Sequence, residues 1–93
     1  SQARDRIAAA ERNVTTADRA VTAAREDYRL MQLRYQTGLA TNAEVLDALR
    51  MRTMAGANLV AARQELAIAR DELARAVGEP RLLQPDDAAV SQP

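Results

Sequence analysis

The chain has 93 residues, of which 47% are hydrophobic and 2% aromatic, and its 13 arginines balance 13 aspartates and glutamates. A single domain of this length has a small core, which contributes a few kcal/mol of net stability unless a partner or a second copy extends it. The zero net charge argues against nucleic acid as that partner. The absence of Cys and His removes disulfides, the usual zinc sites, thiolate nucleophiles and imidazole acid–base chemistry, so we expect no metal, no cofactor and no enzymatic activity.

The first predicted element is a long helix over residues 2–37 with an apolar seam. Large side chains recur at every seventh position, and small ones fill the companion position between them. The large set is Ile7, Val14, Val21, Tyr28 and Tyr35, and the companion set is Ala3, Ala10, Ala17, Ala24 and Met31. This repeat predicts the a/d seam of a left-handed coiled coil, in which alanines let two helix axes approach closely.

The helical pattern stops at Gly38, in the segment RYQTGLATNAEVLDALR from residue 34 to 50. Glycine adopts the left-handed conformation at a helix end without steric cost, and Leu39 after it can fold back onto Leu33. Thr41 and Glu44 have the spacing of a capping box, which predicts that a new helix begins at once. Residues 38–41 are therefore predicted to form a tight tip.

The second predicted helix, over residues 42–77, repeats the seam of the first. Its two sets are Val45, Arg52, Leu59, Leu66 and Leu73, with companions Ala48, Ala55, Ala62, Ala69 and Ala76. The short connection makes the pair antiparallel, so the predicted fold is an all-α two-helix coiled-coil hairpin over residues 1–78 with arms of roughly 54 Å. Arg52 either lays its methylenes along the seam and extends its guanidinium to water, or contacts a partner through it.

Two further features concern the outside of the hairpin and its end. Apolar residues off the seam indicate lateral packing against further helices, although alanine is also simply a good helix former. They are Ala20, Ala23, Met54, Ala57, Ala61, Ala67, Ile68 and Ala74. Gly78 and Pro80 are stop signals, so the second helix is predicted to end at Val77 and residues 79–93 to be extended or disordered.

Two acids, Glu44 and Asp47, lie three residues apart and therefore on one face of the second helix. Several hairpins arranged in a ring would gather these carboxylates around an axis. The alternative is purely structural, because Glu44 caps the helix and Asp47 favours its N-terminus through the macrodipole.

The tip pattern resembles the C-terminal copy of the periplasmic hairpin of TolC-like outer-membrane efflux proteins of Gram-negative bacteria. The resemblance continues in Ala57, Leu59, Ala62, Ala67, Leu73 and Gly78. That resemblance implies a non-enzymatic role in an efflux or type I secretion channel. In this family three chains assemble an α-helical barrel in the periplasm below a β-barrel pore, and the channel works with a periplasmic adaptor and an inner-membrane pump.

The resemblance also implies three groups of site residues. The links that hold the channel closed would involve Arg34 and Tyr35. The adaptor-contacting tip would be Gly38, Leu39, Ala40 and Thr41. The acids of the channel entrance would be Glu44 and Asp47.

The chain differs from a full member of that family in several respects. It has one hairpin, no alternating pattern of membrane strands, and a first helix that begins abruptly at Ser1 without a cap, so we expect a piece of a longer channel protein. Exposed alanines could also pair two isolated hairpins into a four-helix bundle.

Two other classes of protein fit the pattern less well. The first is the hairpin of the adaptor itself. Its tip has a pattern of Arg, Leu and Ser or Thr, which resembles Arg29, Leu33 and Thr41 here, except that the spacing from Leu33 to Thr41 is one residue too long. The second is an unrelated coiled-coil interaction module, or a helical enzyme with Glu44 and Asp47 as a carboxylate pair. No nucleophile or metal set accompanies that pair. The transported substrate is not encoded in these residues.

Overall fold

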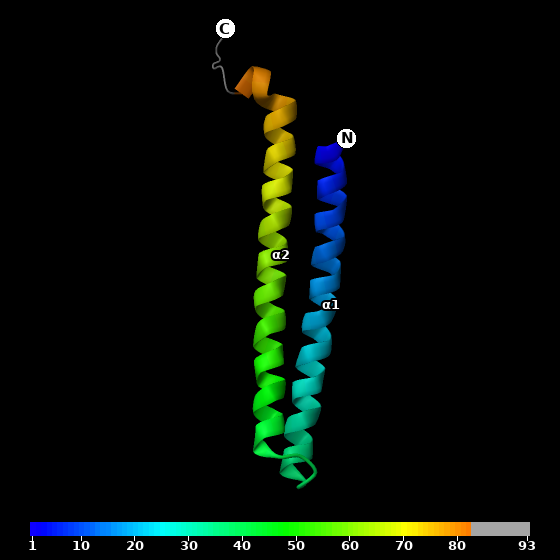
Figure 1. Cartoon of the computed structure of the whole chain (residues 1–93), viewed down its shortest axis with the longest axis vertical. Coiled ribbons are helices and arrows are strands. Elements are labelled where there is room, and N and C mark those ends of the chain that lie inside the picture. The colour runs from blue at the N-terminus through cyan, green and yellow to red at the C-terminus, as the bar shows by residue number, and fades with distance from the viewer. Residues whose placement is uncertain (83–93) are drawn as a thin grey trace.

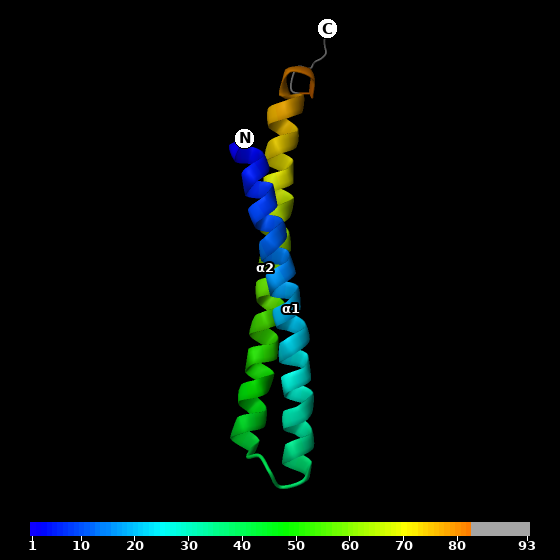
Figure 2. The same cartoon turned by 90° about the vertical axis from the view of Figure 1, so that its right-hand side faces the viewer.

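Two helices connected by a tight turn make up the computed structural model, which describes residues 1–82 (Figure 1). Helix α1 spans Gln2–Gln36 and helix α2 spans Asn42–Leu82, so at 1.5 Å per residue they are about 52 Å and about 62 Å long. The helices run antiparallel and cross each other along their length (Figure 2). The predicted all-α antiparallel hairpin is confirmed, and residues 1–82 contain no strand.

Helix α1 has favourable groups at both ends. The Ser1 hydroxyl accepts a hydrogen bond from the Arg4 backbone N–H at 3.3 Å, which makes Ser1 an N-cap. The expectation of an uncapped start was therefore wrong. Asp5 in the first turn and Arg34 in the last turn have the charges that the helix macrodipole favours.

The core is a thin strip between the two helices. Its buried apolar residues are Ala10, Val21, Ala55, Leu59 and Ala69, and all five occupy predicted seam positions. Val21, Ala55 and Leu59 form one cluster, against which Val14, Ala17 and Ala24 pack. The seven-residue pattern therefore identified the contact surface between the helices correctly.

The buried strip does not reach the tip. None of residues 29–51 is buried, and Tyr35 is 49% exposed although it occupies a seam position. The part of the hairpin from residue 29 to 51 therefore has less buried apolar contact between its helices than the middle of the rod, where Val21, Ala55 and Leu59 form the main cluster. Fewer buried contacts mean a lower free energy of local opening in this part of the hairpin.

Tyr28 and Arg52 lie where the buried strip ends. The guanidinium carbon of Arg52 is 4.7 Å from the centroid of the Tyr28 ring, within the range of a cation–π interaction. Arg52 therefore contacts the facing helix of its own hairpin, which neither of the two sequence-based interpretations specified.

We predict that Arg52→Leu stabilises the isolated hairpin by about 1 kcal/mol. The substitution removes a cation–π contact of about 0.5–1 kcal/mol, but it extends the apolar strip by a leucine whose burial contributes about 1.5–3 kcal/mol when complete. Thermal unfolding followed by circular dichroism should show a higher Tm. Arg50→Leu is the matched control, because Arg50 is exposed and pairs with Asp47 on its own helix. A lower Tm for Arg52→Leu than for this control would contradict the prediction.

The C-terminal end of α2 differs from the prediction. The helix continues past Val77 and through Gly78 and Pro80 to Leu82. Proline removes one backbone hydrogen bond and its ring crowds the carbonyl four residues earlier, which can kink a helix rather than end it. The last turn of α2, drawn in orange, lies at an angle to the rest of the helix (Figure 1). The remainder of the predicted tail, residues 83–93, is outside the described part of the chain.

Neither helix, over the described residues, has a stretch long and apolar enough to cross a membrane.

Candidate functional site

The end of α1 is closed by hydrogen bonds around Gly38. Gly38 has a φ of 78°, the left-handed conformation predicted for it. The Leu39 N–H donates to the Arg34 carbonyl at 2.7 Å, and the Gly38 N–H donates to the Tyr35 carbonyl at 3.2 Å. These two bonds define a Schellman motif, which satisfies carbonyl groups that the helix end would otherwise leave open.

The start of α2 is closed in the same way from the other side. The Glu44 N–H donates to the Thr41 hydroxyl at 3.1 Å, and the Thr41 N–H donates to a carboxylate oxygen of Glu44 at 2.8 Å. The predicted capping box is therefore present in both directions. Glu44 consequently has a structural role, whatever else it does.

The apex between these two motifs projects a hydrophobic side chain into solvent. Leu39 is 75% exposed, and Leu33, onto which it was predicted to fold, is itself largely exposed. Gly38 and Thr41 are exposed, and Ala40 is half-buried. Leu39 therefore offers an apolar contact, on a turn fixed by hydrogen bonds, that a binding partner can cover.

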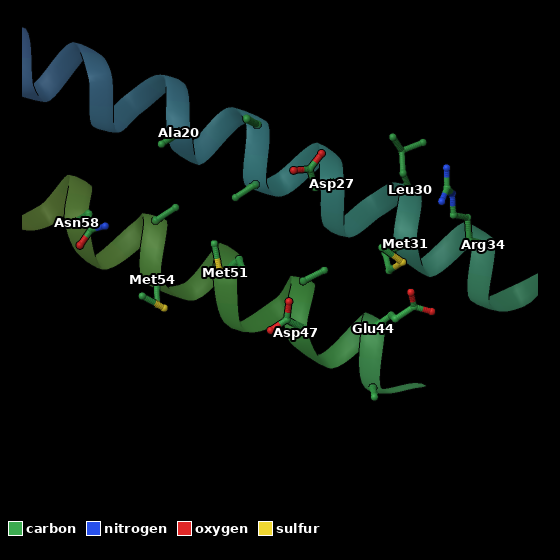
Figure 3. A pocket seen from close by; sticks show the side chains of 15 residues that line it. Ala20, Asp27, Leu30, Met31, Arg34, Glu44, Asp47, Met51, Met54 and Asn58 are labelled. Atoms are coloured by element: carbon green, nitrogen blue, oxygen red, sulfur yellow. The ribbon is translucent and has the colours of Figure 1, made fainter. Parts of the chain in front are cut away.

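One flank of the hairpin near the tip is hollowed by a groove of about 960 Å³ (Figure 3). Side chains of α1 and α2 line it together, with apolar residues in its centre and charged residues among them. The charged residues are Asp27, Arg34, Glu44 and Asp47, and the larger apolar ones are Leu30, Met31, Met51 and Met54. The groove is therefore an apolar surface that also carries three acidic side chains and one arginine.

The structure brings three of the predicted site residues together at this groove. Arg34 of α1 lies across it from Glu44 of α2, and Asp47 follows along α2 (Figure 3). The Asp47 carboxylate pairs with Arg50 of its own helix at 2.7 Å. Tyr35 does not line the groove, because adjacent helical residues point about 100° apart.

Asp27 and Met51 were not identified from the sequence, whereas Met31 was placed in the seam and Met54 on the outside of the hairpin. Met51 lies seven residues beyond Glu44, and Asp27 lies seven residues before Arg34. Each therefore lies on the same face of its helix as a residue that the sequence had already assigned to the site. The seven-residue repeat that identified the seam would have identified these flank residues too, had it been extended beyond the seam positions.

The chemistry of the described residues is that of surface charges. No group of three or more potential metal ligands occurs within residues 1–82. The pKa of Glu26 is lowered because its carboxylate accepts hydrogen bonds from Arg29, and the pKa of Arg29 is raised by the same pair. The two side chains are 2.7 Å apart on one turn of α1 and are well exposed, so this is an ordinary surface ion pair.

A family model with the description "Outer membrane efflux protein" matches residues 2–79, which include the tip, the groove and nearly all of both helices. No curated protein and no solved structure matches the chain.

Proposed function

Because the chain belongs to the outer membrane efflux protein family, we propose that it forms one hairpin of the periplasmic α-helical barrel of an outer-membrane channel. Members of this family are transport proteins. This favours a channel hairpin over the two alternatives considered from the sequence, an adaptor hairpin and a helical enzyme. The observation that carries the proposal, beside the family match, is the apolar surface that the hairpin leaves uncovered. Leu46, Val60 and Ile68 are about half exposed, which suits helices that pack against neighbours on both flanks.

The remaining site roles follow from this placement. The apex with Leu39 is the surface offered to a periplasmic adaptor, together with Gly38, Ala40 and Thr41. In the complete channel three chains surround the pore, and the adaptor connects it to an inner-membrane pump. Because the adaptor binds the open state of the entrance more tightly than the closed state, its binding increases the population of the open state.

Arg34 and Tyr35 are proposed to hold the closed state through contacts with neighbouring helices. Tyr35 contributes little to the core of its own hairpin, since half of its surface is exposed. Arg34 stands beside Glu44 and Asp47 at the groove, where the acids of several hairpins in a ring would attract cations.

The test is the conductance of the full-length channel with Tyr35→Phe and Arg34→Ala in this hairpin. Tyr35→Phe removes one hydroxyl and keeps the ring. A lost hydrogen bond to a charged group costs about 1.5–3 kcal/mol, so the open fraction should rise about tenfold or more. Arg12→Ala, which changes an exposed arginine far from the tip, should leave conductance unchanged. If all three variants conduct like the unmodified channel, the closed-state role is wrong.

A further inference from the structure

Asp27 is a carboxylate in apolar surroundings. Side chains three or four positions apart on a helix are neighbours, and those of Asp27 on α1 are Ala23, Ala24, Leu30 and Met31, all of which line the groove with it. Asp27 therefore has no opposite charge within one turn of its own helix. None of the ion pairs in the described part of the chain includes it. Its carboxylate is consequently available to a ligand.

The other charges at the groove have counterparts close by. Arg50 donates a hydrogen bond to the Asp47 carboxylate at 2.7 Å, and Glu44 lies across the groove from Arg34 (Figure 3). Arg34 is seven residues from Asp27, which is about 10 Å along α1 at 1.5 Å per residue. The Asp27 end of the groove therefore has one negative charge without a counterpart, which suits a single positive charge on a ligand.

The apolar lining of the groove contains three thioethers. Met51 and Met54 on α2 are 49% and 48% exposed, and Met31 on α1 is half-buried. Methionine side chains adapt to the shape of a ligand, and their sulfur atoms make favourable contacts with aromatic rings. The groove volume of about 960 Å³ is within the range of small-molecule sites, which is about 300–1,000 Å³. The groove therefore offers suitable contacts to an aromatic body of moderate size.

We propose that this groove binds small aromatic monocations, with the positive charge beside Asp27 and the aromatic body against Met51 and Met54. The unmatched carboxylate selects for the charge, and the thioethers select for the aromatic body. The site lies within one hairpin, between side chains of α1 and α2. The proposal therefore goes beyond the proposed function and does not require the assembly of a channel.

The fluorescence anisotropy of rhodamine 6G, a planar aromatic monocation, tests the charge recognition on the 93-residue chain. Asp27→Asn should weaken dye binding by about two- to fivefold, which is the effect expected from the loss of one exposed ion pair. Asp18→Asn is the matched control, because Asp18 is an exposed residue of α1 that does not line the groove, and this variant should bind like the unmodified chain. Tetraphenylphosphonium, a second aromatic monocation, should displace the dye.

Nile red, a neutral aromatic dye, separates charge recognition from apolar binding. Its affinity should be the same for Asp27→Asn and Asp18→Asn. Equal affinity of rhodamine 6G for these two variants would overturn the proposal, and so would a loss of Nile red binding in Asp27→Asn as large as that of rhodamine 6G. If sedimentation velocity shows dimers that bind no dye, a second copy covers the groove and the proposal is wrong.

A second pair of variants tests the apolar contacts. Met51→Gln keeps the length of the side chain but replaces the thioether by an amide, so it should weaken the binding of both dyes severalfold. Leu46→Gln is the control, because Leu46 is 55% exposed and does not line the groove. Unchanged binding in Met51→Gln, or an equal loss in Leu46→Gln, would show that the dyes do not lie in the groove. Such a failure would leave the conductance test untouched, since that test depends on Arg34 and Tyr35 in the full-length channel.

Discussion

Replacing Leu59 by alanine is expected to lower the free energy of unfolding of the isolated hairpin by about 2–3 kcal/mol. Leu59 is 8% exposed and belongs to the central cluster with Val21 and Ala55, so its truncation removes buried methyl groups and leaves a cavity between the helices. Because the core of a chain of this size contributes only a few kcal/mol of net stability, this loss is a large part of the total. The loss should appear as a lower midpoint in urea unfolding followed by circular dichroism.

Leu46→Ala is the control for this experiment. It is the same chemical change on the same helix, but Leu46 is 55% exposed and lies outside the buried strip. Its effect should stay within about 0.5 kcal/mol, partly because alanine is the better helix former. Equal losses for the two variants would mean that the strip along the seam is not what holds the helices together.

Two glycines allow a second comparison, in which one substitution is expected to have opposite effects at two positions. Gly38→Ala should destabilise the hairpin by about 1–2 kcal/mol, because Gly38 has a φ of 78° and the left-handed conformation is costly with a Cβ. Gly56→Ala should stabilise it by about 0.8–1 kcal/mol, because Gly56 lies inside α2, where glycine is a poor helix former.

Sterics do not complicate this comparison. A Cβ atom built at either glycine meets no atom of the surrounding structure within 4 Å, beyond the adjacent residues and the local helix backbone, so the conformation of the backbone is what separates the two positions. Thermal unfolding of both variants, at a concentration low enough to keep the chain monomeric, measures the difference. A shift of Tm in the same direction for both would show that the turn at Gly38 does not require its left-handed backbone.

Features set by short-range geometry were predictable from the sequence. The seam residues Ala10 and Leu59 followed from a seven-residue repeat, which depends only on the pitch of the α-helix. Gly38 and the Thr41–Glu44 cap followed from residue types at fixed spacings, and the structure shows the left-handed Gly38 and both predicted hydrogen bonds of the capping box. Each of these features involves groups only a few residues apart in the chain.

Two features were missed: a contact between the two helices, and the continuation of α2 through residues that usually end a helix. The register that places Val21 beside Leu59 also places Tyr28 beside Arg52 one heptad nearer the tip, but this becomes visible only when both helices are considered together. The stop signals Gly78 and Pro80 do not end α2, which continues to Leu82 with its last turn at an angle to the rest of the helix (Figure 1). The roles of the tip and groove residues in a channel remain predictions, because they depend on neighbouring chains.

The hydrogen-bonded turn has a thermodynamic consequence for whatever binds there. Leu39, Gly38, Thr41 and Glu44 all have their backbone N–H groups engaged within the hairpin itself. The loop is therefore preorganised, and a partner that covers Leu39 does not have to offset the conformational entropy of ordering it, which would otherwise cost about 1–2 kcal/mol per residue. Docking at the tip should accordingly proceed as a rigid-body encounter, and differences in affinity between partners should arise mainly from their dissociation rates.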